Sequence, residues 1–143
     1  MNFESFINDF VIPENWKILS ARFPVELFTR EDQRLKIIGE IIEFHEALTV
    51  YKELVPENYD DVIAELADIV ISTCTMLRIL ERGYRWYNES FSVSPEAWIC
   101  LVLGRNFDRL ISTAKEYSEL HGIDLEEAIR KKIEYNRTRP DWT

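Results

Sequence analysis

The sequence predicts an all-α protein from its scarcity of turn formers, its helical periodicity and its helix boundary signals. Only four glycines and five prolines occur in 143 residues, whereas 46% of the chain is apolar and 30% is charged. Such a composition favours helices over a turn-rich sheet. No segment shows the strict alternation of apolar and polar residues that is typical of a strand. We expect a bundle of four to five helices.

The first part of the chain combines an irregular arm with a long helix. Residues 1–28 form an aromatic N-terminal arm, in which we expect a short helix near 2–10 and then an extended stretch. The extended stretch is expected because prolines, Pro13 among them, interrupt the helical pattern. Thr29 is followed by two acidic residues, which suit the positive end of a helix dipole. This signal starts a helix that we expect at 30–54.

Three further helices are expected, and each has a start signal. Asn58 or Asp60 can cap the second long helix, Pro95 suits the first turn of the third, and Asp124 can cap the fourth. A glycine or a proline follows each of these helices and ends it. We expect the second long helix to end at about residue 82, the third helix to cover about 95–121 and the fourth to cover 125–139. All of them belong to a single domain of residues 1–143.

Composition argues against several classes of protein. A formal net charge of −9 does not suit a nucleic-acid-binding protein, which normally presents a basic surface. The most apolar run, residues 69–80, is too short to span a bilayer, and the N-terminus lacks the features of a signal peptide. We therefore expect a soluble, cytoplasmic protein with neither nucleic acid nor membrane as a partner. Cys74 and Cys100 are expected to be buried free thiols, because no ligand spacing accompanies them.

Four acidic residues lie on two apolar helices, in pairs three residues apart. Glu40 and Glu43 lie in GEIIEFHEAL, and Glu65 and Asp68 lie in AELADIVIS. Side chains at this spacing project from one helix face, so each pair of carboxylates can converge. The short connection between the helices predicts an antiparallel hairpin, which would bring the two pairs together. Hard cations such as Mg²⁺ or Mn²⁺ prefer ligand sets made of oxygen.

Chance offers a competing interpretation of these acid pairs. The chain has 26 acidic residues, so pairs such as Glu116 and Glu119 also arise on solvated helix faces. A di-iron site fits less well, because it needs Glu-x-x-His on two helices and neither His45 nor His121 has that spacing. The pattern alone leaves both a metal site and a solvated edge open.

The same residues resemble the motifs of the all-α NTP pyrophosphohydrolase superfamily, the MazG-like and dimeric dUTPase group. The signature of that family is a Glu-x-x-Glu helix followed by Glu-x-x-Asp, here Glu40 to Glu43 and Glu65 to Asp68. The C-terminal piece GIDLEEAIRKKIEYNRTRP also resembles the family's last helix, with its lysine and its Asn-x-x-Arg-Pro ending. The loop and helix at 84–121 are an insertion relative to many members.

The resemblance implies a MazG-like helical bundle that cleaves a nucleoside triphosphate, (d)NTP, to the monophosphate and pyrophosphate, as in nucleotide-pool house-cleaning. It also implies a homodimer or homotetramer and a dependence on Mg²⁺, with Mn²⁺ as an alternative. One of the acids, or Glu46 on the next turn, would orient or deprotonate the attacking water. The other implied roles are metal ligation by Glu40, Glu43, Glu65 and Asp68, and phosphate or sugar contact by Lys132, Asn136 and Arg139.

Two other functions stay open. The apolar surface of the first two long helices exceeds what one hairpin can hide, which would also suit a non-catalytic module that oligomerises or binds a protein partner. A nucleotide sensor would bind metal and nucleotide without turnover.

Overall fold

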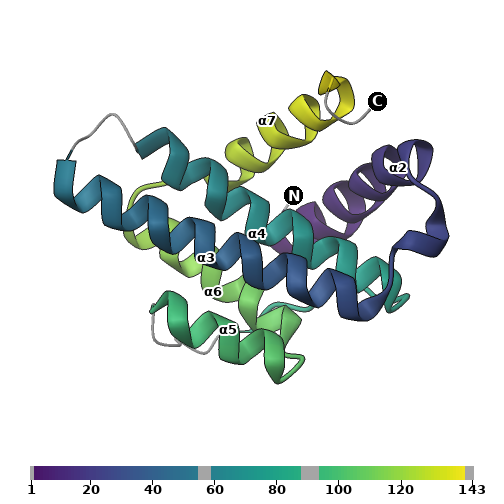
Figure 1. The fold of residues 1–143 in the computed structure, drawn as a ribbon, viewed down its shortest axis with the longest axis horizontal. Coiled ribbons are helices and arrows are strands. Elements are labelled where there is room, and N and C mark those ends of the chain that lie inside the picture. The colour runs from purple at the N-terminus through teal and green to yellow at the C-terminus, as the bar shows by residue number, and fades with distance from the viewer. Residues whose placement is uncertain (1, 55–58, 88–93, 141–143) are drawn as a thin grey trace.

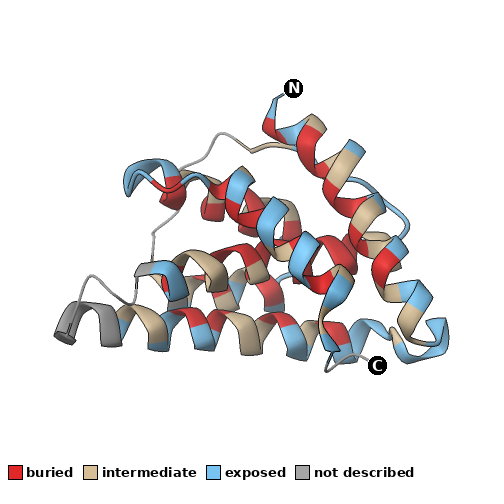
Figure 2. Cartoon of the chain, turned by 90° about the horizontal axis from the view of Figure 1, so that it is seen from above, coloured by how far each residue is buried: buried red, intermediate tan, exposed pale blue. Residues whose placement is uncertain are grey.

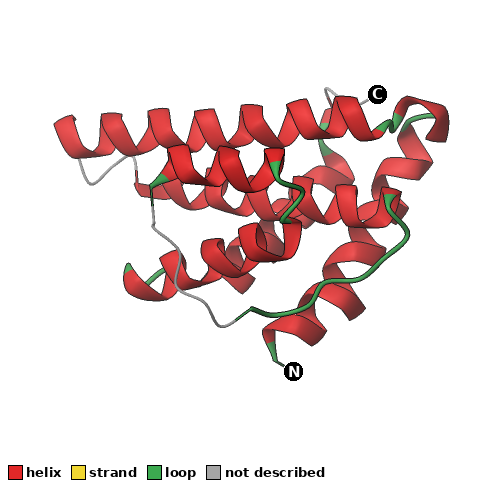
Figure 3. Ribbon diagram, turned by 90° about the horizontal axis from the view of Figure 1, so that it is seen from below, coloured by secondary structure: helices red, strands yellow, loops and turns green. Residues whose placement is uncertain are grey.

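Helices dominate the structure, a computed structural model that describes residues 2–54, 59–87 and 94–140. No strand occurs in these ranges (Figure 3), so the all-α prediction is confirmed. None of the helices found there is long and apolar enough to cross a membrane. The elements are α1 (Phe3–Phe6), a π-helical turn (Ile7–Val11), α2 (Ile12–Arg22), a 3-10 turn (Val25–Leu27), α3 (Arg30–Leu54), α4 (Tyr59–Ile79), α5 (Pro95–Leu103), α6 (Phe107–Leu120) and α7 (Leu125–Thr138).

The helix α4 lies at the centre of the molecule. It packs against α2, α3, α6 and α7, and most of its residues from Val62 to Leu77 are buried. As Figure 1 shows, α3 and α4 run side by side in opposite directions, and α7 lies along the other side of α4. The predicted antiparallel hairpin is therefore confirmed. In Figure 2 the buried residues of the helices face one another across the interior.

One apolar core joins segments from both ends of the chain, from Phe6 of α1 to Ile129 of α7. Phe44 of α3 stacks on Trp98 of α5 with ring centroids 5.2 Å apart. Tyr117 of α6 meets both rings edge-on, at 5.4 and 5.9 Å. The segment that we expected as an insertion thus contributes α5 and α6 to the core.

Capping contacts confirm the predicted starts of α3 and α7. The Asp32 backbone N–H donates to Thr29 Oγ1 at 3.1 Å at the start of α3. The Glu127 N–H donates to Asp124 Oδ1 at 3.1 Å at the start of α7. Gly122, the glycine expected to end the preceding helix, has a φ of +66°, which glycine adopts without strain.

The N-terminal arm is helical from Ile12 to Arg22, where an extended chain was predicted, so the prediction is wrong for that part of the arm. The first two helices and the π-helical turn between them cover Phe3 to Arg22. Pro13 is tolerated because it stands in the first turn of α2, where its missing N–H removes no α-helical hydrogen bond. The helical path brings Trp16 to Phe28, with ring centroids 5.2 Å apart.

The helix predicted at about 95–121 is in fact two helices, so the prediction of one continuous helix is wrong. The first, α5, ends at Leu103, and α6 begins at Phe107. Gly104 caps α5, and Arg105 has a φ of +60°, which takes the chain out of the helical path. The break allows α6 to pack against both α5 and α4.

Two smaller predictions also change. Because α4 begins at Tyr59, Asp60 lies in its first turn and is not its cap, while Asn58 falls outside the described residues. Cys74 is buried as expected, but Cys100 is exposed. The exposure arises because α5 buries only the face that carries Trp98.

Candidate metal and phosphate site

A cleft of about 390 Å³ lies between α2, α3, α4 and α7. The structure brings into this cleft all but one of the site residues expected from the sequence. Acidic side chains come from α3 and α4, whereas basic and amide side chains come from α7. The expected residues that line the cleft are Glu40, Glu43, Glu65, Asp68, Lys132, Asn136 and Arg139.

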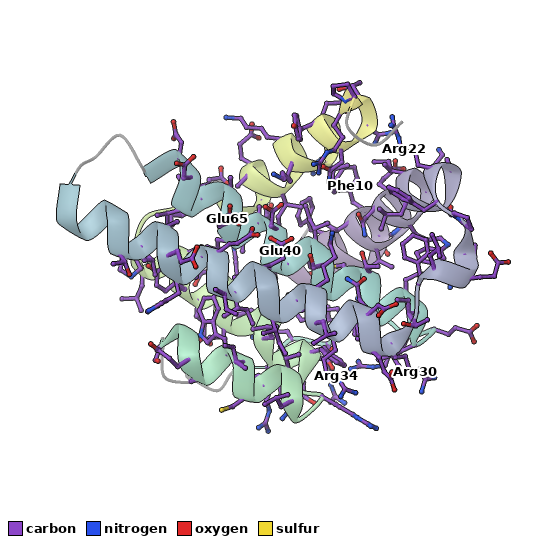
Figure 4. All side chains as sticks on the ribbon, viewed as in Figure 1. Phe10, Arg22, Arg30, Arg34, Glu40 and Glu65 are labelled. Atoms are coloured by element: carbon purple, nitrogen blue, oxygen red, sulfur yellow. The ribbon has the colours of Figure 1, made fainter. Side chains whose placement is uncertain are left out.

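Three carboxylates converge where α3 faces α4. One carboxylate oxygen from each of Glu40, Glu43 and Glu65 lies within 4.8 Å of the others. Figure 4 shows Glu40 and Glu65 beside each other between the two helices. The convergence follows from local structure, because Ile41 and Phe44 are buried in the core and thereby orient α3.

Two of these carboxylates each keep a buried oxygen without a partner. Oε2 of Glu40 and Oε2 of Glu65 accept no hydrogen bond from the residues that the structure describes. Leaving a buried carboxylate oxygen unpaired is costly, since it loses its water without compensation. A hard divalent cation would supply that compensation, so the donor set fits Mg²⁺ or Mn²⁺.

Burial and mutual repulsion raise the pKa of the clustered acids. Desolvation, followed by the charges of Asp68 and Glu43, raises the pKa of Glu40 from 4.5 to about 7. Desolvation, followed by the charges of Asp68, Glu43 and Glu40, raises the pKa of Glu65 to about 8. Desolvation also raises the pKa of Asp68, against the opposing charge of Lys132. Without a cation, the cluster therefore retains protons near neutral pH.

The facing wall of the cleft is one side of α7. Lys132 Nζ lies 3.4 Å from Asp68 Oδ1 and 5.3 Å from the centre of the Tyr135 ring. Asn136 is buried, and its Oδ1 has no hydrogen-bond partner in the described part of the chain. The guanidinium of Arg139 lies 5.4 Å from the Tyr135 ring centre. Lys132 and Asn136 stand four residues apart on one face of α7, and Arg139 follows directly after its end.

Lys36 and Asn15 also line the cleft, although neither was expected there. Lys36 stands one helical turn before Glu40, and its charge opposes the rise in the pKa of Glu40 and of Asp68. The spacing of four residues between Lys36 and Glu40 could have predicted from the sequence that Lys36 lies beside the acid cluster. Asn15 is buried on α2, and its Nδ2 donates to Thr75 Oγ1 at 2.7 Å. The sequence could not place Asn15, because an extended chain was predicted at that position.

Glu46 is the expected residue that the structure does not bring into the cleft. It is exposed on α3 and is not among the residues that line the cavity. Its suggested part in activating water stays a prediction.

No family model, curated protein or solved structure matches this chain. The chemistry open to the site must therefore be read from its own residues. One wall offers carboxylate oxygens to a divalent cation, and the other offers a lysine, an arginine and an amide to an anion. A phosphate compound that carries a bound cation would complement both walls.

Proposed function

We propose that this protein is a metal-dependent, MazG-like nucleoside triphosphate pyrophosphohydrolase, which converts (d)NTP and water into (d)NMP and pyrophosphate. The proposal rests on one observation, the convergence of the Glu40, Glu43 and Glu65 carboxylates within 4.8 Å, in a cleft that Lys132 also lines. Unneutralised acids would repel a polyphosphate, so this cluster can serve an anionic substrate only with cations bound. The resemblance of the three motifs to that superfamily supports the type of reaction.

The acid wall would hold the cation. Glu40 and Glu65 offer buried oxygens without partners, Glu43 offers an exposed carboxylate, and Asp68 lies one turn beyond Glu65. When bound there, Mg²⁺ would neutralise charge on the phosphates and lower the pKa of a water molecule. Glu43, the exposed member of the cluster, is our choice for the carboxylate that orients the attacking water.

The α7 wall would bind and position the phosphates. Lys132 Nζ can donate hydrogen bonds to phosphate oxygens, and the planar guanidinium of Arg139 suits a bidentate contact with a phosphate group. Asn136 can accept a hydrogen bond from a sugar hydroxyl through its free Oδ1. Such contacts would hold the anhydride bridge between the α and β phosphates beside the acids.

A pyrophosphate-release assay over a panel of (d)NTPs with Mg²⁺ tests the proposal. We expect turnover by the wild type and a loss of about 100-fold or more in Glu43→Gln and in Asp68→Asn. Glu119→Gln is a matched control, because it removes an exposed acid on α6. Unchanged activity in both site variants would refute the site, and binding of nucleotide without product would favour a sensor.

Exposed apolar side chains favour self-association of the chain, whether the protein is an enzyme or a non-catalytic module. Leu35 is 67% exposed and Ile42 is 45% exposed, and their spacing of seven residues puts them on one face of α3. Leu103 of α5 is 59% exposed. We infer that the chain forms a homodimer or homotetramer, and the second candidate function is a non-catalytic module for such assembly.

Light scattering on the wild type and on Leu35→Glu tests whether the chain forms an oligomer through this face of α3. We expect the wild type to have the mass of an oligomer and the variant to dissociate, because a charge would be buried in the contact. Ser20→Glu, which adds the same charge at an exposed position on α2, serves as a control for the surface charge. An oligomer that neither binds Mg²⁺ nor cleaves any nucleotide would favour the module over the enzyme.

A further inference from the structure

Four arginines surround a small pocket at the beginning of α3. The pocket has a volume of about 210 Å³ and lies between α3, the end of α4 and the start of α6. Its apolar floor consists of Met76, Leu80 and Phe107. Its rim consists of Arg30, Arg34, Arg82 and Arg105. In the described part of the chain no acidic residue lines it, although the chain as a whole carries a net charge of −9.

Among the residues that the structure describes, most of these guanidinium groups find no counter-ion. Arg82 Nη1 donates to Asp108 Oδ2 at 2.7 Å. The other three, Arg30, Arg34 and Arg105, form no ion pair within the described ranges, and Arg34 Nε is buried there without a hydrogen-bond partner. Like charges gathered around one pocket repel one another, and an anion bound among them would relieve that repulsion.

The backbone beside the pocket adopts a conformation that side chains rarely take. Among the non-glycine residues that the structure describes, Glu81 and Arg105 have positive φ, at +57° and +60°. Both residues follow the last turn of a helix, where the Arg82 N–H donates to Leu77 O and the Asn106 N–H donates to Leu101 O, so each left-handed residue belongs to a helix C-terminal cap. Arg105 itself belongs to the rim, and Glu81 precedes Arg82 directly. The two caps thus place Arg82 and Arg105 beside the pocket, although glycine would adopt the backbone conformation at 105 with less strain.

The shape and chemistry of the pocket point to a particular class of anion. A tetrahedral phosphate presents oxygens in several directions and can meet arginines from different elements, whereas a carboxylate is matched by a single guanidinium. The apolar floor suits a carbon skeleton attached to the anion. A volume of 210 Å³ is below the roughly 300–1,000 Å³ of pockets for drug-sized ligands, so the ligand is small. We propose that the arginine pocket binds a small organic phosphate monoester.

This pocket is separate from the cleft of the proposed enzyme. Figure 4 shows Arg30 and Arg34 at the beginning of α3, away from Glu40 and Glu65. No residue lines both cavities. Binding in the arginine pocket therefore requires neither a divalent cation nor the acid cluster, and it stands whether or not the protein cleaves nucleotides.

Titration calorimetry with phenyl phosphate in EDTA tests the proposal. We expect saturable binding by the wild type, weaker binding of inorganic phosphate, which lacks an apolar body, and weaker binding of benzoate, which lacks a phosphate. Arg34→Gln and Arg105→Gly should each weaken phenyl phosphate about tenfold, because each removes a charged donor. Arg105→Gly should not lower the melting temperature, because glycine accepts the positive φ.

Two control variants make the test specific. Lys17→Gln removes one positive charge from the exposed surface of α2 and should leave binding unchanged. Glu43→Gln changes the acid cluster and should also leave it unchanged. The proposal is overturned if the wild type shows no saturable binding, if both arginine variants bind as the wild type does, or if Glu43→Gln loses binding. Equal affinity for benzoate would overturn the phosphate class.

Discussion

At the scale of single residues, Glu40 and Glu65 link the acid cluster to the stability of the protein. Their pKa values are about 7 and about 8 in the folded chain, against 4.5 for the ordinary side chain. A carboxyl whose pKa is raised by folding binds its proton more tightly in the folded state. Its contribution to stability is therefore full below about pH 4.5 and is lost as the pH rises through 7 to 8.

For the metal-free protein, we expect the free energy of unfolding to fall between pH 5 and pH 8.5, and to fall less steeply in Glu65→Gln. The variant lacks one of the groups that must lose a proton inside the fold. Urea unfolding in EDTA at a series of pH values measures both slopes. Glu119→Gln should keep the wild-type slope, since that acid is exposed. Identical slopes in the wild type and Glu65→Gln would contradict the assigned burial of Glu65.

Lys132 is the residue through which we expect α7 to act on the substrate. Its Nζ lies 3.4 Å from Asp68 Oδ1, on the boundary between the acid wall and the basic wall. If it binds phosphate, Lys132→Gln should lower kcat/KM about tenfold or more, because a charged hydrogen bond is lost. Steady-state kinetics with the preferred nucleotide provide the measurement. Lys131→Gln, which changes the exposed neighbour, should match the wild type, and an equal effect of both substitutions would point to general charge instead.

At the scale of helices, the sequence predicted those elements whose ends carry local signals. Thr29 and Asp124 define the starts of α3 and α7 through contacts within one turn, so no tertiary information is needed. The acid pairs could be predicted for the same reason, because a spacing of three residues sets the helix face. Pro13 and Gly104 misled the prediction, since each is compatible with both a break and a continuing helix. Packing against the rest of the protein decides between these outcomes.

The stacked pair of Phe44 and Trp98 joins α5 to α3, which supports α5 as part of the core. Trp98 is fully buried, so Trp98→Ala should destabilise the protein by about 3–5 kcal/mol through the cavity that it leaves. Trp98→Phe should cost less, because it keeps an aromatic ring against Phe44 and removes an indole N–H that finds no partner among the described residues. Denaturant unfolding measures both values. A loss below 1 kcal/mol in Trp98→Ala would mean that α5 is not integral to the fold.

At the scale of the whole molecule, two charged sites of opposite sign lie on the same helical hairpin. The arginine rim draws Arg30 and Arg34 from the beginning of α3, and the acid cluster draws Glu40 and Glu43 from the turns that follow. Burial of Ile37, between the two sets, holds α3 against the core. The positions of both sites are thus fixed by the packing that stabilises the fold, and the binding of either ligand should stabilise the folded chain.

This coupling gives a test of the acid cluster that does not depend on activity. A cation that binds only the folded state stabilises it by about 2.7 kcal/mol at 100 times its Kd, which for a chain of this size is roughly 5–10 °C in Tm. We expect Mg²⁺ to produce such a shift in the wild type and EDTA to reverse it. Because protons compete for the raised-pKa carboxylates Glu40 and Glu65, the shift should be larger at pH 8 than at pH 6. Calorimetric melting of the wild type beside Glu40→Gln gives the comparison, and a shift of equal size in that variant would place the cation elsewhere on this acidic protein.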